Sequence, residues 1–179
     1  MASTLQLSLG AWAVLALVCE GDSHGWALVR AMAPRGEIGR VWSIQRALVY
    51  RTIDLAVAAG LIEHAGTEQG TRGSTRRLLH VTPAGRRAVE RWLAEPVLHV
   101  RDLRSALLLK LLFAERSGRD RAPLLEAQLA ILTEAIAVLE AQLADDPPAA
   151  VNVGAFRLET ARAGLRFVEG ELAHLRPDA

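Results

Sequence analysis

Residues 43–83 have the sequence SIQRALVYRTIDLAVAAGLIEHAGTEQGTRGSTRRLLHVTP. The first part of this stretch predicts a helix, because Ser43 is a good N-cap and Gly60 follows Ala59 as a helix stop. Three residues at helical spacing would form the narrow buried stripe of this helix: Val49, Ile53 and Ala56.

The second part of the stretch predicts a β-hairpin. Two short strands, Leu61–Ala65 and Arg77–Val81, flank the segment Gly66–Arg76, which is rich in Gly, Thr and Arg and is expected to form a flexible tip. Thr82 then caps a further helix, which has proline at its first position and runs to about Ala94.

Two more helices are predicted before this stretch. The first spans Leu7–Cys19 and stops at the Glu-Gly-Asp sequence of residues 20–22. Ser23 can cap the second helix, which runs to about Arg30 and ends at a Pro-Arg-Gly turn. Three helices followed by a strand, a hairpin and a second strand in about 85 residues are typical of a winged helix-turn-helix.

The rest of the chain is predicted to be helical, and Pro96 marks the boundary between domains at residues 1–95 and 96–179. Two leucine-rich heptad seams flank a break at 145–148. The first seam is formed by Leu125, Leu129, Leu132, Ile136, Leu139 and Leu143, and the second by Leu158, Ala161, Leu165, Val168, Leu172 and Leu175. Such seams need a partner helix, so we expect an antiparallel pair that packs against a copy of itself.

A homodimer is expected because one chain alone would leave apolar side chains exposed. If the two seam helices cover each other, seven further residues still need cover: Leu107, Leu108, Leu111, Leu112, Phe113, Ile131 and Val138. Burying a Leu or Phe is worth roughly 1.5–3 kcal/mol. Exposure of several such side chains would exceed the stability margin of a small domain.

Composition excludes several other classes of protein. The 179 residues are 51% hydrophobic and 23% charged, which is the profile of a globular chain rather than a disordered one. The apolar run Leu7–Cys19 is too short to span a bilayer and lacks the basic leader of a signal peptide. A single cysteine allows no internal disulfide. We therefore predict a cytoplasmic protein with no membrane partner.

The net charge of +1 hides an asymmetry between the two halves of the chain. Residues 1–95 hold eleven arginines and eight acidic residues, a net charge of +3. Residues 96–179 hold ten basic and twelve acidic residues, a net charge of −2. The first half is therefore the part that is suited to a polyanion.

In a winged helix-turn-helix the third helix enters the major groove of DNA and the wing follows the phosphate backbone. The residues expected to contact double-stranded DNA from the third helix are Ser43, Gln45, Arg46, Ala47, Tyr50 and Arg51. Those expected to do so from the wing are Arg72, Ser74 and Arg76, because guanidinium groups and hydroxyls bind phosphates. From composition alone, arginines on a hairpin are explained equally well as solvated surface groups.

Four motifs occur in order along the chain. They are LALVCEG (15–21) followed by HGWAL (24–28), ALVY (47–50) with GLI (60–62), RRLLHVTPAG (76–85) and LLLKLLFA (107–114). With these motifs the chain resembles the PadR family of transcriptional regulators across nearly its whole length. The resemblance implies an N-terminal winged helix-turn-helix, a C-terminal helical dimerisation domain and binding to DNA.

Some residues depart from the pattern of this family. Ala47 stands where the family prefers Gly, Leu48 where it prefers a small polar residue, and Arg51 where it prefers Pro. Leu78 and Leu79 replace the usual aromatic pair of the wing. Because Leu48 can contact a thymine methyl group and Arg51 adds a contact to phosphate or guanine, we expect an operator different from those of typical members.

The polar residues indicate no enzyme, no metal site and no cofactor. The five histidines (24, 64, 80, 99 and 174) are dispersed, and none has ligand spacing to a second His, Cys or acid. No Gly-rich phosphate loop follows a strand. His24, at a helix start, is expected to be a structural or capping group rather than a catalyst, and Cys19 is expected to be a buried core thiol.

Trp92 is the residue predicted to bind a small aromatic effector. Some members of the PadR-like group bind flat aromatic compounds on tryptophan between subunits, so the resemblance implies such a role, and plain packing is the competing interpretation. Trp12 and Trp26 are expected in the core. Trp42 is expected to pack as a hydrophobic staple before the recognition helix.

The sequence therefore predicts a mainly α-helical protein with a small β-wing, which acts as a homodimeric repressor on a pseudo-palindromic operator. The alternative is a small-molecule binding or sequestering protein, built on the same scaffold, with little affinity for DNA. Leu48 and the weak net charge favour this alternative.

Overall fold

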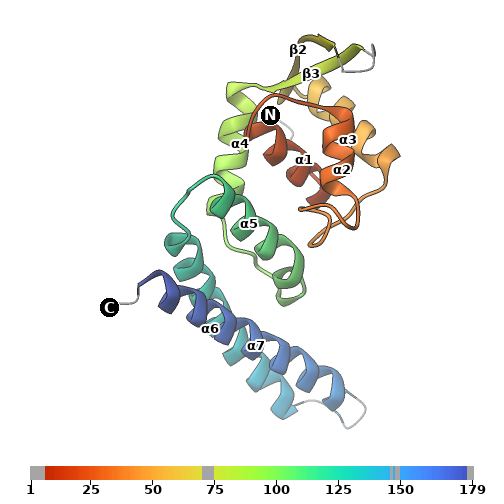
Figure 1. Cartoon of the computed structure of the whole chain (residues 1–179). Coiled ribbons are helices and arrows are strands. Elements are labelled where there is room, and N and C mark those ends of the chain that lie inside the picture. Colours follow the sequence, from red (N-terminus) through yellow and green to blue (C-terminus); the bar gives the residue numbers. More distant parts are fainter. Residues whose placement is uncertain (1–6, 70–74, 146, 148–149, 177–179) are drawn as a thin grey trace, which may run out of the picture. The chain divides into compact units, whose positions relative to one another are not determined.

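The computed structural model of the chain describes residues 7–69, 75–145, 147 and 150–176. The chain divides into two compact units, Met1–Trp92 and Leu93–Ala179. The first unit combines helices with a small sheet, and the second is helical in the part that the structure describes (Figure 1).

Three helices of the first unit lie on the N-terminal side of its hairpin: α1 (Leu9–Cys19), α2 (Gly25–Met32) and α3 (Arg46–Ala58). All three correspond to predicted helices, and each begins later than the sequence predicts. In α1 the reason is that Ser8 caps the helix: its Oγ accepts a hydrogen bond from the N–H of Ala11 at 3.2 Å.

Ser23 does not cap α2, contrary to the prediction, because it lies in a short strand that pairs with Leu79. His24 is the cap instead. Its Nδ1 accepts a hydrogen bond from the N–H of Ala27 at 3.1 Å. This agrees with the expectation that His24 is a structural or capping group.

Ser43 does not cap α3 either. The N–H of Ile44 donates to the carbonyl oxygen of Met32 at 3.2 Å, which holds this segment extended beside the end of α2. The helix therefore begins at Arg46, with Gln45 as an N-cap whose side chain makes no capping bond. The buried residues of α3 are those predicted: Val49, Ile53 and Ala56.

The segment between α2 and α3 is more than a simple turn, because it contributes to the core. Ile38 is completely buried, and its N–H donates to the carbonyl oxygen of Ala31 at 3.2 Å. A Cβ atom at position 39 would lie 1.7 Å from the carbonyl oxygen of Ala33. Only glycine fits at position 39, so the close approach of this segment to the end of α2 depends on that residue.

The strands form one antiparallel sheet in the order β1-β3-β2: β1 (Ser23–His24), β2 (Ile62–Gln69) and β3 (Thr75–Val81). The register of β2 and β3 shifts between His64 and Thr67, where Gly66 has a φ of +107°. Both strands continue past this irregularity and are longer than predicted. Arg76 consequently lies in β3 and not in the tip of the hairpin.

Helix α4 (Pro83–Ala94) follows the sheet as predicted. Thr82 caps it, since Thr82 Oγ1 accepts a hydrogen bond from the N–H of Gly85 at 3.1 Å. A Cβ atom at Gly85 would lie 2.1 Å from the carbonyl oxygen of Leu61. The first turn of α4 therefore packs directly on the backbone that leads into β2.

The second unit begins with two short turns and continues with three α-helices. These elements are the 3-10 turn η1 (Val100–Asp102), the π-helical turn η2 (Leu103–Leu107), α5 (Leu108–Arg116), α6 (Ala122–Asp145) and α7 (Val151–Leu175). Figure 1 shows α6 and α7 as two long helices side by side, and a short connection makes them antiparallel. This pair was predicted from the two heptad seams.

The seams pack on each other within one chain. Leu125 and Leu132 lie in one apolar cluster with Val168, and a second cluster joins Leu139, Leu158 and Ala161. Leu107 and Leu111 belong to the first cluster and are buried in it. The prediction that these two leucines need cover from a second copy was therefore wrong, because η2 and α5 fold onto the seams.

Two buried polar side chains bind the segment that precedes η1. Gln128 is completely buried; its Oε1 accepts from the N–H of Val97 at 2.8 Å and its Nε2 donates to the carbonyl oxygen of Val97 at 3.0 Å. Lys110 Nζ donates to the carbonyl oxygen of Glu95 at 2.7 Å. Burial lowers the pKa of Lys110 from 10.5 to about 8.

Among the described helices, α6 alone has the length and apolar composition that would let it cross a membrane. Core helices of soluble proteins have the same properties. In this chain α6 buries Leu125, Leu132 and Leu139 in the two clusters that it shares with α7.

Candidate nucleic-acid interface

The predicted contact residues of α3 lie on its exposed side. Ser43 and Gln45 precede the helix, and Arg46, Ala47, Tyr50 and Arg51 occupy its first two turns. All six are exposed, whereas Val49 between them is buried. Residues i, i+1, i+4 and i+5 share one side of a helix, so the structure brings these residues to one surface. Leu48 is also exposed there.

An aromatic cluster surrounds Arg46 at the start of α3. The guanidinium carbon of Arg46 lies 5.7 Å from the ring centroid of Trp26 and 5.7 Å from that of Tyr50. Both distances are within the range of a cation–π interaction. The prediction that Trp26 lies in the core was wrong, because 47% of this residue is exposed. We call Trp26, Arg46 and Tyr50 the Arg46 cluster.

The glycine before Trp26 makes this arrangement possible. A Cβ atom at Gly25 would lie 2.6 Å from Cε1 of Tyr50, so the ring of Tyr50 occupies the space that a side chain would fill. The start of α2 and the second turn of α3 are therefore in close contact. Sequence reasoning placed Tyr50 and Arg46 on the interface but missed Trp26, whose partner is twenty positions away.

His24 connects the start of α2 to the wing. Its Nε2 lies 3.1 Å from Nη1 of Arg76, while its Nδ1 faces the N–H of Ala27. A neutral imidazole has one acceptor nitrogen, so in the tautomer that caps α2 through Nδ1, His24 does not also accept a hydrogen bond from Arg76. Arg76 is only partly exposed, and its guanidinium group lies beside the imidazole ring of His24.

The wing supplies further basic groups. Arg77 is exposed on β3, and His80 on the same strand contacts Asp22 through Nδ1 at 2.6 Å. The predicted residues Arg72 and Ser74 lie outside the described residues. Between Gln69 and Thr75, the wing therefore stays a sequence-based prediction.

Trp92, the predicted effector residue, is packed against a second tryptophan. The rings of Trp12 and Trp92 are stacked at a centroid distance of 5.4 Å and an interplanar angle of 4°. Only 7% of Trp92 is exposed. One face of the Trp92 ring is thus covered by Trp12, and a flat ligand would need the other face or the place of Trp12.

Metal and thiol chemistry find no support in the described residues. No group of three or more His, Cys, Asp or Glu side chains gathers there to hold a metal ion. Burial raises the pKa of Cys19 to about 11, so the reactive thiolate is rare at neutral pH.

Comparison with known families identifies the first unit. The model of the transcriptional regulator PadR-like family matches residues 14–91. Residues 14–91 are therefore similar to the transcriptional regulators of this family, and this segment contains α2, α3 and the three strands of the sheet.

Among solved structures, the chain is similar to Bacillus subtilis PadR in complex with operator DNA, with 18% identity and a TM-score of 0.48 over 93% of this chain and 99% of that chain. It is also similar to smu.1604c of Streptococcus mutans UA159, with 13% identity and a TM-score of 0.43 over 92% and 98%. A third is the PadR-like regulator BC1756 of Bacillus cereus, with 17% identity and a TM-score of 0.41 over 97% and 99%. No curated protein sequence matches the chain.

Proposed function

We propose that this chain is a PadR-like transcriptional regulator, a cytoplasmic repressor that binds a pseudo-palindromic operator as a homodimer. DNA binding is assigned to the first unit and dimerisation to the second. The observation that carries the proposal is the exposed side of α3, on which six polar, small or aromatic residues gather over a buried apolar stripe. A helix of this kind can enter a major groove without loss of core packing.

The contact residues divide into two kinds by geometry. Arg46 and Arg51 lie on a helix, which can present a side chain to a base edge at a fixed angle. Ser43, Gln45 and Ala47 accompany them at the start of α3. The wing residues Arg72, Ser74 and Arg76, together with the Tyr50 hydroxyl, are assigned to phosphates, which contribute affinity but little sequence information.

Dimerisation is assigned to exposed apolar residues that the chain does not cover. Phe156 is 74% exposed on α7, and Val138 is 50% exposed on α6. Leu98, Val153 and Phe167 of the same unit are exposed as well. Leu98, Val138 and Phe156 line the same cavity, and exposed apolar residues that gather in one place often mark interaction sites. A two-fold interface would also align two recognition helices with a palindromic site. Repression would follow from occlusion of a promoter.

An effector is proposed to modulate DNA binding through Trp92. The stacked pair Trp12–Trp92 joins α1 to the last turns of α4, so a flat aromatic ligand that displaces Trp12 would change the packing of the first unit. Binding of such a ligand and of operator would then oppose each other by the same factor, as linkage requires.

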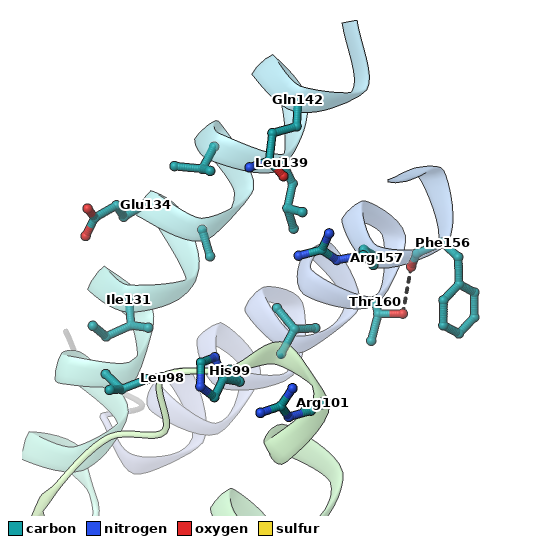
Figure 2. A pocket seen from close by; sticks show the side chains of 13 residues that line it. Leu98, His99, Arg101, Ile131, Glu134, Leu139, Gln142, Phe156, Arg157 and Thr160 are labelled. Carbon is teal, nitrogen blue, oxygen red and sulfur yellow. Dashed lines mark hydrogen bonds between the residues drawn. The ribbon is translucent and has the colours of Figure 1, made fainter. Parts of the chain in front are cut away.

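A second candidate function is small-molecule binding with little affinity for DNA, and one observation favours it. A cavity of about 500 Å³ lies between η1, α6 and α7. Its lining combines apolar side chains, among them Leu98, Ile131 and Leu139, with charged ones, Arg101, Glu134 and Arg157 (Figure 2). A site of this size could hold a drug-sized molecule.

Two measurements test the proposal. Fluorescence anisotropy with the DNA upstream of the chain's own gene should give tight binding, and Arg51→Ala should weaken it by roughly 5- to 150-fold at that sequence only. Arg166→Ala, an exposed arginine on α7, is the matched control and should change nothing. Light scattering should give a dimer that Phe156→Ser weakens. Absence of any specific binding by a folded dimer would favour the second function.

A further inference from the structure

The Arg46 cluster indicates a specific role for Trp26 that the sequence pattern did not predict. Three features need an explanation: a tryptophan that is half exposed, an arginine at the first position of a helix, and a glycine that makes room for the tyrosine. Each is unfavourable or restrictive in isolation. A cation at a helix N-terminus, in particular, faces the positive end of the helix dipole.

The two rings contact Arg46 and leave its hydrogen-bonding edge available. Arg46 makes no ion pair or side-chain hydrogen bond with any described residue, and its described cation–π interactions are with the rings of Trp26 and Tyr50. A ring attracts a guanidinium through the ring face, whereas the five N–H groups point outward in the guanidinium plane. The cluster therefore restricts the plane of the guanidinium while its donors remain free.

A restricted guanidinium plane is useful for one kind of contact in particular. Reading a guanine through O6 and N7 needs two parallel N–H bonds in the plane of the base. A phosphate, by contrast, can be bound from many directions. Holding Arg46 before DNA arrives removes part of the conformational entropy that the contact would cost.

We propose that Trp26 is a positioning residue for DNA recognition: with Tyr50 it orients the Arg46 guanidinium toward a guanine in the major groove. This inference rests on the proposed function, because it requires α3 to enter the groove. The Tyr50 hydroxyl remains available for a phosphate, since the ring alone contacts Arg46.

The test compares the DNA sequences that variants select from duplexes with a randomised core. Wild-type protein should enrich one motif, and Arg46→Ala should lose information at one position, the base that Arg46 reads. Trp26→Leu, which keeps apolar bulk but removes the ring, should lose information at that same position. Trp26→Phe should restore it. Trp26 is half exposed, so both variants should fold, and circular dichroism verifies this.

Affinities for the selected motif then give the coupling between the two residues. Arg46→Ala should weaken binding by roughly 5- to 150-fold, and Trp26→Leu by roughly 2- to 30-fold. In the Arg46→Ala background, Trp26→Leu should add little, because its partner is absent. The salt dependence of binding should stay the same in Trp26→Leu, since no phosphate contact is removed.

The outcomes separate the inference from the proposed function. If Arg46→Ala loses a position but Trp26→Leu selects the wild-type motif with wild-type affinity, the role of Trp26 is refuted while the function stands. A fall of about one unit in the salt slope of Trp26→Leu would also refute it, because Trp26 would then serve a phosphate contact. If wild-type protein enriches no motif, both proposals are overturned.

Discussion

Replacing Gln128 with leucine should destabilise the second unit strongly, although the two side chains have similar volumes. The amide of Gln128 is the described partner of both backbone groups of Val97, with bonds of 2.8 and 3.0 Å. Leucine offers neither a donor nor an acceptor. Since both Gln128 and Val97 are buried, water cannot replace the lost partners without opening the structure.

The expected magnitude follows from these two bonds. A buried backbone group without a partner costs about 1–3 kcal/mol, so two such groups cost about 2–6 kcal/mol. The gain in apolar surface from leucine offsets a small part of this. Gln142→Leu is the matched control: the same substitution on an exposed position of α6 should change stability by less than about 0.5 kcal/mol.

Two readouts are needed because the chain has two units. All four tryptophans lie in the first unit, so fluorescence follows the unfolding of that unit, and the far-ultraviolet helical signal adds the second. Hydrogen exchange at the amide of Val97 reports the lost bond directly and should become faster. If Gln128→Leu unfolds at the same denaturant concentration as the parent and its Val97 amide remains protected, the assignment of this bond pair as a stabilising contact is wrong.

Three further outcomes are expected. Unfolding restores the pKa of Lys110 from about 8 to 10.5, so the unfolded chain binds more protons between these values and stability should rise with pH there; Lys110→Met should flatten that rise in denaturation measured across the window. Alkylation of Cys19 at pH 7 should be roughly 100-fold slower than that of a free thiol, because its pKa is raised from 9.0 to about 11. Gly85→Ala should lower the free energy of unfolding by about 1–3 kcal/mol, because the added methyl group overpacks against the backbone of Leu61; tryptophan fluorescence in denaturant measures this loss. By contrast, the methyl group added in Gly170→Ala meets nothing within 4 Å, so this substitution should raise the free energy of unfolding by about 0.5–1 kcal/mol.

The helices and strands were predictable because their signals are local. The spacing of Val49, Ile53 and Ala56 and the cap at Thr82 involve residues within one helix, and the structure has them as predicted. The starts of α2 and α3 were not predictable in the same way. A serine caps a helix only if its backbone is free to adopt the capping conformation. Ser23 instead pairs with Leu79 in the sheet, and the segment of Ser43 is held extended by the hydrogen bond from Ile44 to Met32.

The exposed surface that forms the candidate interface was predictable in part for the same reason. Exposure of Arg46 and Arg51 follows from the periodicity of α3, which places them away from the buried stripe. The role of Trp26 does not follow, because tryptophan in a short apolar helix is usually buried. Trp26 lies beside Arg46 only in the folded chain. The signal in the sequence was Gly25, because a glycine before the aromatic residue leaves room for the ring of Tyr50 at the start of α2.

The second unit covers by itself some of the apolar residues for which the sequence suggested a second copy. Counting apolar residues predicted a second copy because too many leucines needed cover, yet η2 and α5 cover Leu107 and Leu111 within the chain. What remains is smaller but more specific: Phe156 is three-quarters exposed in a helix whose other face is well packed. An exposed phenylalanine gives no stability to a monomer, and it lines the same cavity as Val138. Because Val138 and Phe156 are already partly covered, a partner that buries both would recover at most roughly 1.5–3 kcal/mol for each side chain in each subunit, so the proposed dimer rests on this one patch rather than on the seams.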